Sequence, residues 1–534
     1  MDAQDAMGHV TGPAATAAAA VAAIPRRYNF AADILARNLA RAGKPAYIDP
    51  RGSWTYGQLA ERVARFGKLL RALGIAREQR ILICLLDTID WPTAFLGAVK
   101  AGVIAVPVNT LMSEADYRFM LEDSRARLLV VSEELYPRFA GLIGSCPDLE
   151  HVIVSGKQGH GHTLFEDALQ AAEGPDATAP TTRDDICFWL YTSGSTGKPK
   201  GAVHVHAAPR LTDDLYGAPV VGLTENDVVY SVAKLFFAYG LGNAMSFPLA
   251  AGSTTVLMPG RPTPEAVAAT LRQHGVTVFF AVPTFYAAFL AANPVEPTAL
   301  ALRSCISAGE ALPVDVGRRW SERYGVDILD GLGSTEMLHI FLSNRMGEVR
   351  YGTSGKPVPG YEVRLVGDNG EAVAPGEMGE LQVRGPTSAV MYWNNREQSR
   401  ATFLGEWTRS GDKYIEDKDG YYLYCGRRDD MLKVGGMYVA PFEVEGVLLG
   451  HPDVLEAAVV AWPDQDGLIK PKAFVRLKGQ AAADEKTAQA LQEYCRLKLA
   501  AYKYPRWIEF RTELPKTATG KIQRFKLRAE ASSG

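Results

Sequence analysis

The chain has 534 residues, of which 47% are hydrophobic and 22% are charged, a composition typical of a globular protein with a large buried core. Its net charge is only -3 at pH 7, so no overall basic field favours nucleic acid or an acidic membrane as a partner. Small-molecule chemistry is therefore the expected function class. The six cysteines are scattered without metal-ligand spacing, which indicates reduced thiols.

The first 29 residues are expected to form a flexible tail. An alanine run in this segment has acidic residues before it and basic residues after it, the reverse of a secretory signal. No apolar run reaches the roughly 18 residues that a membrane span needs. We therefore expect a cytoplasmic protein without membrane insertion.

Between about residues 30 and 260, short apolar segments such as RILICLL and RLLVVS alternate with helix-like segments such as Tyr56 to Leu73. This alternation favours an α/β fold with largely buried strands. Apolar segments resume with VTVFFAVP and SCISAGE. The segments YEVRLV and GELQVRG, with the turn signal DNG between them, then indicate antiparallel strands in a small β-rich unit at about 352–424.

The chain after residue 428 predicts a second, smaller α+β domain. Its expected strands are VLEAAVVAW, PKAFVRLK and RWIEFRTEL, and a helix from Asp484 to Ala500 places Leu491 and Cys495 on one apolar face. The predicted architecture is a large N-terminal α/β domain at 30–428 followed by a small mobile α+β domain at 429–534.

The stretch YTSGSTGKPKG, Tyr191 to Gly201, is a glycine-rich and hydroxyl-rich loop that suits a polyphosphate. It is not a Walker A loop, because Pro199 follows Lys198 and disfavours a helix there. A solvent-exposed glycine turn is the alternative interpretation. The residues expected around the phosphates are Thr192, Ser193, Gly194, Ser195, Thr196, Gly197 and Lys198.

Four further segments follow this loop. They are SAGE at 307–310, GLGSTE at 331–336, TRSGDK at 408–413 with GRRDD at 426–430, and PKTATGKIQR at 515–524. In this order and spacing, the five segments resemble the adenylate-forming acyl-CoA synthetase superfamily of AMP-binding enzymes. The resemblance covers nearly the whole chain from about residue 30.

The resemblance implies that the glycine-rich loop holds the β- and γ-phosphates of ATP. It also implies that Thr335 contacts the α-phosphate and that Glu336 serves Mg²⁺, which prefers oxygen ligands. Taken alone, GSTE could be a helix N-cap followed by a first-turn acid. The segments expected along the adenine are Ala308, Gly309 and Glu310 together with Asp330, Gly331 and Leu332. The family often has an aromatic residue at the position of Leu332.

The remaining roles come from the same resemblance. Asp412 would accept hydrogen bonds from the ribose hydroxyls, with Arg427 nearby, although a solvated surface acid is the alternative. Lys521 would bridge the attacking carboxylate and the α-phosphate. The C-terminal domain would then turn about Asp429 to admit a thiol. The residues expected to line the coenzyme A tunnel are Lys433, Gly435 and Gly436, for which a glycine hairpin turn is the alternative.

Two segments are expected near the acyl group, KLFFAYGLGNAMSFPL at 234–249 and GLGSTEMLHIFLSN at 331–344. Their candidate pocket residues are Phe236, Ala238, Tyr239, Gly240, Gly333, His339 and Ile340. These residues could form a flat apolar slot with one polar edge, which suits a benzene ring, and several could instead be core residues. The second segment looks most like that of benzoate-CoA ligases, with substituted benzoates and longer acids left open.

The expected activity is ATP-dependent ligation of benzoate, or a close aromatic carboxylate, to coenzyme A through an acyl adenylate. The expected cofactors are ATP, Mg²⁺ and coenzyme A, and the expected state is a monomer or homodimer. The alternatives are an enzyme that loads a carrier protein, another aryl or medium-chain acid ligase, and a non-catalytic binding module. The chain ends thirteen residues after Lys521, which favours free coenzyme A. His204 and His206 are expected to be structural.

Overall fold

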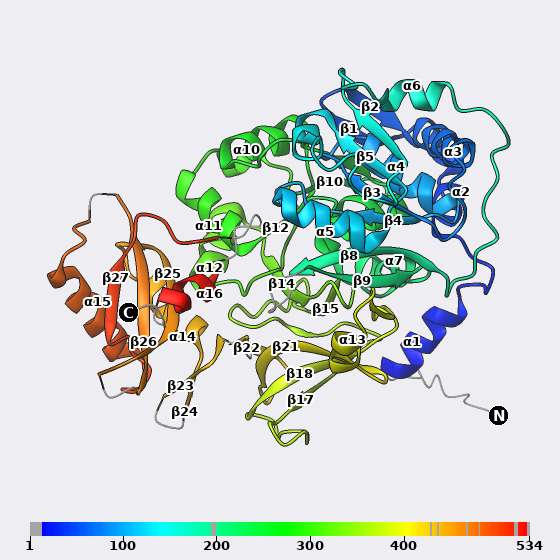
Figure 1. The fold of residues 1–534 in the computed structure, drawn as a ribbon. Helices are drawn as coiled ribbons and strands as arrows, with labels where there is room; N and C mark the ends of the chain where they lie inside the picture. The colour runs from blue at the N-terminus through cyan, green and yellow to red at the C-terminus, as the bar shows by residue number, and fades with distance from the viewer. Residues whose placement is uncertain are drawn as a thin grey trace, which may run out of the picture.

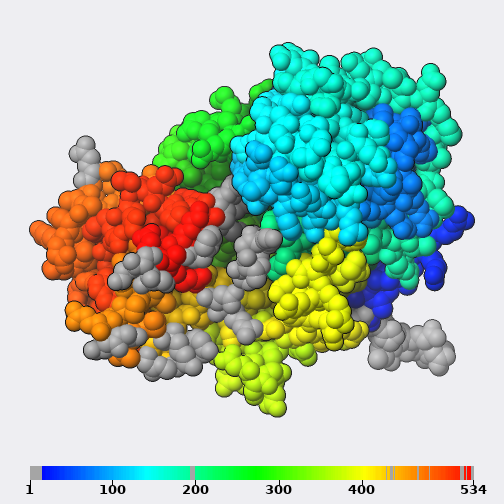
Figure 2. All heavy atoms as spheres, in the orientation of Figure 1, coloured from blue at the N-terminus to red at the C-terminus, as the bar shows by residue number. Residues whose placement is uncertain are grey.

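The computed structural model describes residues 13–193, 199–427, 430–434, 437–465, 468–479, 481–516 and 522–530 (Figure 1). Two large sheets form most of the N-terminal part, and a smaller antiparallel sheet follows them in the chain. The C-terminal part forms a separate lobe in Figure 2, orange to red, against the green and yellow parts of the large domain. No described helix combines the length and apolar character needed to cross a bilayer. The predicted α/β class with a small α+β C-terminal domain is confirmed.

The first large sheet has eight strands in the order β19-β9-β8-β4-β3-β5-β6-β7. Its strands are β3 (Arg80–Cys84), β4 (Ile104–Pro107), β5 (Leu128–Ser132), β6 (His151–Ser155), β7 (Thr163–Leu164), β8 (Ile186–Ser193), β9 (Pro199–Val205) and β19 (Met391–Tyr392). The helices in this part of the chain are α3 (Tyr56–Ala72), α4 (Asp90–Lys100), α5 (Glu114–Ser124) and α6 (Phe165–Gln170). The strands from β7 to β8 in this order pair in parallel, whereas β9 runs antiparallel to both β8 and β19.

The second large sheet has nine strands in the order β16-β15-β14-β13-β12-β10-β11-β1-β2. Its strands are β1 (Pro45–Asp49), β2 (Gly52–Thr55), β10 (Val228–Ser231), β11 (Thr254–Val256), β12 (Val278–Ala281), β13 (Ser304–Ser307), β14 (Ile328–Gly333), β15 (Ile340–Ser343) and β16 (Lys356–Pro357). The associated helices are α2 (Phe30–Ala36), α7 (Ala208–Thr212), α8 (Ala238–Leu241), α9 (Phe247–Ala251), α10 (Pro264–Gln273), α11 (Pro283–Ala292) and α12 (Val314–Tyr324). Two π-helical segments, Asp213–Val221 and Gly242–Ser246, lie in the same part of the chain.

The third sheet and the C-terminal lobe complete the fold. The third sheet contains β17 (Glu362–Val366), β18 (Met378–Arg384), β20 (Phe403–Leu404), β21 (Trp407–Glu416) and β22 (Tyr422–Arg427), with helix α13 (Arg396–Thr402). The C-terminal lobe contains β23 (Leu432–Val434), β24 (Met437–Val439), β25 (Val454–Pro463), β26 (Ile469–Leu477), β27 (Trp507–Phe510), α14 (Pro441–Leu449), α15 (Glu485–Lys498) and α16 (Arg524–Ala529). The predicted helix and three strands of this lobe are all present, and Leu491 and Cys495 are buried as expected.

Local sequence explains how the helices dock. Helix α3 begins with a capping box in which Thr55 and Gln58 satisfy each other's backbone donors. Its apolar face packs on α4 at Gly97, where a Cβ atom would come within 2.7 Å of the Phe66 Cβ. Only glycine lets the two helices approach this closely.

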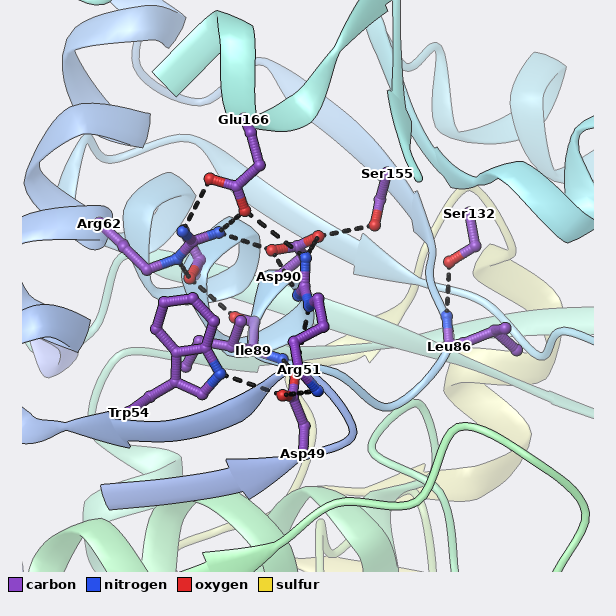
Figure 3. Close-up of polar contacts among 11 residues, drawn as sticks. Asp49, Arg51, Trp54, Arg62, Leu86, Ile89, Asp90, Ser132, Ser155 and Glu166 are labelled. Carbon is purple, nitrogen blue, oxygen red and sulfur yellow. Dashed lines mark hydrogen bonds and ion pairs between the residues drawn. The ribbon is translucent and has the colours of Figure 1, made fainter. Parts of the chain in front are cut away.

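A partly buried polar cluster ties these helices to β1 and β2 (Figure 3). The Arg62 guanidinium donates to Asp90 at 2.6 Å and to Glu166 at 2.8 Å, and Arg51 pairs with Asp90 at 2.9 Å. Ser155 donates to the second carboxylate oxygen of Asp90 at 2.7 Å. Because the charged groups satisfy one another, we interpret this cluster as structural.

The N-terminal segment differs from the expected tail. Residues 13–22 form helix α1, and Ile24 and Tyr28 are buried. Arg183 donates to the carbonyl oxygens of Val21 at 2.9 Å and Ile24 at 2.8 Å. For residues 13–28 the prediction of a flexible tail is therefore wrong, because tertiary contacts order a sequence that composition alone presents as a linker.

Candidate active site

Four strands of the second sheet end at one edge. Strands β10, β12, β13 and β14 are adjacent and parallel, β12 and β13 end at Ala281 and Ser307, and Asp330, within β14, pairs with Ser307. Ligands of open α/β sheets bind beyond the carboxyl ends of parallel strands. Three of the predicted site segments, at 234–240, 307–310 and 331–336, follow directly from these strands.

The segments expected along the adenine lie side by side. Ser307 ends β13 and leads into Ala308, Gly309 and Glu310, and Gly309 has a φ of 93°, a left-handed conformation that favours glycine. Beside them, Asp330, Gly331 and Leu332 belong to β14. Leu332 is half-buried and pairs with Leu342 of β15, so its side chain packs on the apolar core.

Asp330 is the buried polar group of this edge. Its Oδ2 accepts a hydrogen bond from the Leu312 backbone N–H at 3.4 Å, and its Oδ1 has no partner among the described residues. Burial raises the pKa of Asp330 to about 8. A protonated carboxyl group here can both donate and accept a hydrogen bond, as the amino and ring nitrogens of adenine require.

The GSTE segment is held by two neighbouring strands. The Nε2 of His204, on β9, lies 2.8 Å from the carbonyl oxygen of Thr335. The Tyr392 hydroxyl, on β19, donates to Glu336 Oε1 at 2.7 Å, and the Ala389 N–H donates to the Glu336 carbonyl at 2.7 Å. These hydrogen bonds therefore fix the positions of Thr335 and Glu336.

The His204 imidazole is neutral. Burial lowers the pKa of His204 to about 4, so its Nε2 carries a proton and donates to Thr335. Its ring stacks on Phe188 with 5.4 Å between centroids. His206 accepts a hydrogen bond from the Phe30 N–H at 3.3 Å. These contacts agree with the structural role expected for both histidines.

The predicted phosphate loop joins β8 to β9. Thr192 pairs with Lys200 and Ser193 with Pro199 in the ladder, and Gly194, Ser195, Thr196, Gly197 and Lys198 lie outside the described residues. The strand that leaves the loop is the same β9 that carries His204. Phosphate loop and GSTE segment are thus connected through one strand.

Asp412 and Arg427 face each other on β21 and β22. They are partners in the ladder, and Arg427 Nε lies 3.3 Å from Asp412 Oδ1. Asp412 is only 8% exposed, so the alternative of a solvated surface acid is wrong. The nearby Asp412 carboxylate raises the pKa of Arg427, which keeps the guanidinium charged.

The acyl segment after β10 packs around His339. Phe236 and His339 are buried, and the Tyr239 ring lies 5.6 Å from the His339 ring. The Tyr239 hydroxyl donates to the carbonyl oxygens of Ile306 at 3.2 Å and Ala281 at 3.3 Å, which fixes its ring at the strand edge. The structure therefore places Phe236, Ala238, Tyr239 and Gly240 on one segment and Gly333, His339 and Ile340 on the facing one.

Two glycines allow these segments to meet. A Cβ at Gly242 would lie 2.4 Å from the His339 Cδ2, and a Cβ at Gly333 would lie 2.7 Å from the His339 carbonyl oxygen. Gly242 lies in a π-helical turn, a feature frequent at functional sites. A larger residue at Gly242 would displace the His339 ring, and one at Gly333 would clash with the His339 backbone.

Asn243 is a polar residue beside His339 that sequence reasoning missed. Asn243 Oδ1 lies 3.1 Å from His339 Nε2, and burial lowers the pKa of His339 to about 3, so the imidazole is neutral and donates. The His339 Nδ1 has no partner within the described part of the chain. The sequence signal that could have identified Asn243 is a single amide side chain within an otherwise apolar segment.

Several predicted residues cannot be placed. Lys521, Asp429, Gly435 and Gly436 lie outside the described residues, and Lys433 is described only through its backbone pairing with Tyr438. Next to Lys521, Arg524 donates to Glu445 at 2.6 and 3.0 Å, which anchors α16 on α14.

A divalent cation is compatible with Glu336. Among the described residues, no group of three or more histidine, cysteine, aspartate or glutamate side chains could hold a metal. Glu336 Oε2 accepts no hydrogen bond from the described residues, and Mg²⁺ commonly uses one carboxylate together with phosphate oxygens. The donor set therefore fits a cation that is bound with a nucleotide.

Comparisons with known proteins agree with this arrangement. The chain matches the family model of AMP-binding enzymes over residues 36–393 and that of the AMP-binding enzyme C-terminal domain over residues 443–521. It is 59% identical to the benzoate--CoA ligase of Thauera aromatica over 95% of this chain and 97% of that protein. The crystal structure of a benzoate CoA ligase from Burkholderia xenovorans LB400 is similar with a TM-score of 0.89 and 53% identity, over 94% of this chain and all 100% of that one. That of an anthranilate CoA ligase in complex with anthranoyl-AMP gives a TM-score of 0.91 and 46% identity, over 96% and 98% of the two chains. The chain therefore belongs to the family of AMP-binding enzymes.

Proposed function

We propose that the protein ligates benzoate, or a closely related aromatic carboxylate, to coenzyme A at the expense of ATP. The observation that carries this proposal is the packing of the Tyr239 ring on His339, 5.6 Å between centroids, beside the strand edge that carries the expected adenine and GSTE segments. From it we infer a flat aromatic slot for the acid. Similarity to a relative named benzoate--CoA ligase supports the same choice of acid.

In the first step, a carboxylate oxygen attacks the α-phosphorus of ATP and pyrophosphate leaves. Asp330 and the backbone of 308–310 hold the adenine, and Asp412 accepts from the ribose hydroxyls. Thr335 contacts the α-phosphate, and Lys521 neutralises the charge that develops between carboxylate and phosphate. A bound Mg²⁺ would balance phosphate charge beside Glu336.

In the second step, the thiol of coenzyme A attacks the acyl carbon, a proton is released and AMP leaves. Lys521 must withdraw to open a path to the adenylate. We assign this movement to rotation of the C-terminal lobe about Asp429, with Lys433, Gly435 and Gly436 lining the path of the thiol.

The slot favours a flat acid. The rings of Phe236, Tyr239 and His339 provide apolar faces, whereas Asn243 and His339 provide one polar edge. Because the Tyr239 hydroxyl is engaged by two backbone carbonyls, its ring cannot turn aside for a long aliphatic chain.

The test is AMP release with ATP and Mg²⁺ over benzoate, substituted benzoates, acetate, hexanoate and palmitate, each with and without coenzyme A. We expect the largest coenzyme A-dependent turnover with benzoate. Ala238→Leu should lower turnover of benzoate without changing the KM for ATP. Preference for aliphatic acids would refute the slot, and adenylate formation without coenzyme A turnover would favour a carrier protein as the acceptor.

A further inference from the structure

Tyr392 has no role in the mechanism above, yet its phenol touches Glu336. The hydroxyl donates to Glu336 Oε1 at 2.7 Å across 56 positions of sequence. Tyr392 is 3% exposed and Glu336 is half-buried, so the bond is partly shielded from water. A hydrogen bond to a carboxylate is roughly twice as strong as one between neutral groups.

The position of this phenol is fixed on three sides. Its backbone N–H donates to the Ser399 hydroxyl at 2.9 Å, and its ring lies 5.2 Å from that of Phe403. The ammonium of Lys200, on β9, lies 4.7 Å from the centre of the same ring. In the ladder, Tyr392 pairs with Ala202 of β9. A ring turned away from Glu336 would lose its contacts with Phe403 and Lys200.

The hydrogen bond from Tyr392 engages one of the two oxygens of the Glu336 carboxylate. The bond uses Oε1 and leaves Oε2 free of hydrogen bonds from the described residues. The carboxylate is thus turned so that one oxygen is committed to the protein and the other is available.

We propose that Tyr392 is a positioning residue, which holds the Glu336 carboxylate so that Oε2 faces the divalent cation of the bound nucleotide. This inference rests on the proposed function, in which Glu336 serves that cation. Through β19 and β9, Tyr392 also links the carboxylate to the strand that leaves the phosphate loop. Cation and phosphates are then positioned by the same pair of strands.

The test compares Tyr392→Phe with a matched control, Tyr56→Phe. Tyr56 is likewise buried and donates to the Ser253 carbonyl oxygen at 2.7 Å, but it takes no part in the site. Binding of Mn²⁺ is measured by electron paramagnetic resonance with a non-hydrolysable ATP analogue present. The Mg²⁺ concentration for half-maximal AMP formation is measured in parallel.

We expect Tyr392→Phe to raise the Mn²⁺ dissociation constant and the Mg²⁺ requirement about tenfold, the effect of losing one hydrogen bond to a charged group. The KM for benzoate should not change, and Tyr56→Phe should match the wild type in both assays. In a Glu336→Gln background, Tyr392→Phe should add nothing further.

A second variant separates hydrogen bonding from shape. With 4-aminophenylalanine at position 392, the ring keeps a weaker donor, so the Mn²⁺ dissociation constant should lie between those of the wild type and of Tyr392→Phe. If Tyr392→Phe does not fold, as judged by thermal unfolding, this variant carries the test, with an expected severalfold rise. An unchanged constant in it would overturn the inference.

The outcomes distinguish the two proposals. If Glu336→Gln weakens Mn²⁺ binding and Tyr392→Phe does not, the positioning role is overturned and the proposed function stands. If neither variant changes Mn²⁺ binding, the assigned role of Glu336 fails and the inference fails with it. Ligase activity over the panel of acids is tested independently of both.

Discussion

The two sides of the site are built in different ways. On the nucleotide side, polar side chains are held by hydrogen bonds and ion pairs from neighbouring strands, as Tyr392 holds Glu336 and Arg427 holds Asp412. On the acyl side, rings pack on rings and glycine permits close approach, as between Gly242 and His339. Loss of polar groups should therefore change the use of ATP, whereas changes of size should change the choice of acid.

The largest effect is expected at Lys521. Lys521→Ala removes the charge that we propose to lie between carboxylate and α-phosphate, and we expect adenylation to fall by roughly 10²–10³-fold, as for loss of one donor to a developing anion. Conversion of preformed benzoyl adenylate to the thioester should be nearly unchanged, as measured by stopped-flow assays of each half-reaction. Lys526→Ala, an exposed neighbour, is the control. Equal loss in both half-reactions would contradict the assigned role.

The second largest effect is expected at Asp412, on the proposed nucleotide side of the site. Asp412→Ala removes the proposed acceptor of two ribose hydroxyls, and at about 1.5 kcal/mol for each charge-assisted bond the KM for ATP should rise roughly 100-fold. The KM for benzoate should stay within about twofold. Glu362→Ala breaks the 2.6 Å ion pair with Arg384 in the same sheet and is the control. A change in benzoate KM as large as that in ATP KM would show that the two sides are not independent.

A change of size should act on the acyl side alone. Gly242→Ala places a Cβ against the His339 ring, and overpacking costs about 1–3 kcal/mol, so we expect the KM for benzoate to rise roughly tenfold or more. The KM for ATP should not move. The control is Gly446→Ala, because a Cβ at this exposed position meets no atom within 4 Å. If Gly242→Ala had wild-type benzoate kinetics, the proposal that His339 lines the slot for the acid would be wrong.

A further effect concerns stability and its dependence on pH. The native Asp330 stays protonated up to a pKa of about 8, whereas the unfolded chain ionises near 4, so this group makes the wild type less stable as pH rises between these values. Asp330→Asn removes the penalty. The difference in unfolding free energy, variant minus wild type, should increase by about 1.4 kcal/mol per pH unit from pH 5 to 7 in denaturant titrations. Exposed Asp327→Asn is the control, and parallel curves for wild type and Asp330→Asn would disprove the raised pKa.

The sequence was sufficient for the family and the fold class, both of which are confirmed. Short contiguous motifs such as SAGE and GSTE can be recognised directly in the sequence. The order of the strands in the sheet then explains why these motifs lie close together in the structure. The hydrogen bonds that fix the positions of these motifs cannot be recognised from the sequence in the same way. His204 and Thr335 are separated by 131 positions and Tyr392 and Glu336 by 56, and neither pair has a periodicity or spacing that marks it. The roles of the site residues themselves remain predictions.

Composition was misleading where tertiary contacts decide the structure. The alanine-rich start suggested a tail up to residue 29, yet from residue 13 it folds against the large domain. Asp412 gives the same lesson, since an acid that could have been a solvated surface residue is a buried strand position in the structure. Burial depends on neighbours that are distant in the chain, and a single sequence does not name them.

The docking of β19 on β9 has a consequence for recombining this enzyme with its relatives. Trp393, next to Tyr392, stacks on Trp189 of β8 at 4.7 Å and donates to the Asp123 carbonyl oxygen at 2.8 Å. A crossover placed between residues 206 and 390 would take the two sides of this contact from different parents. Crossovers after Trp393 keep the contact intact, so chimeras that exchange only the C-terminal lobe should retain it.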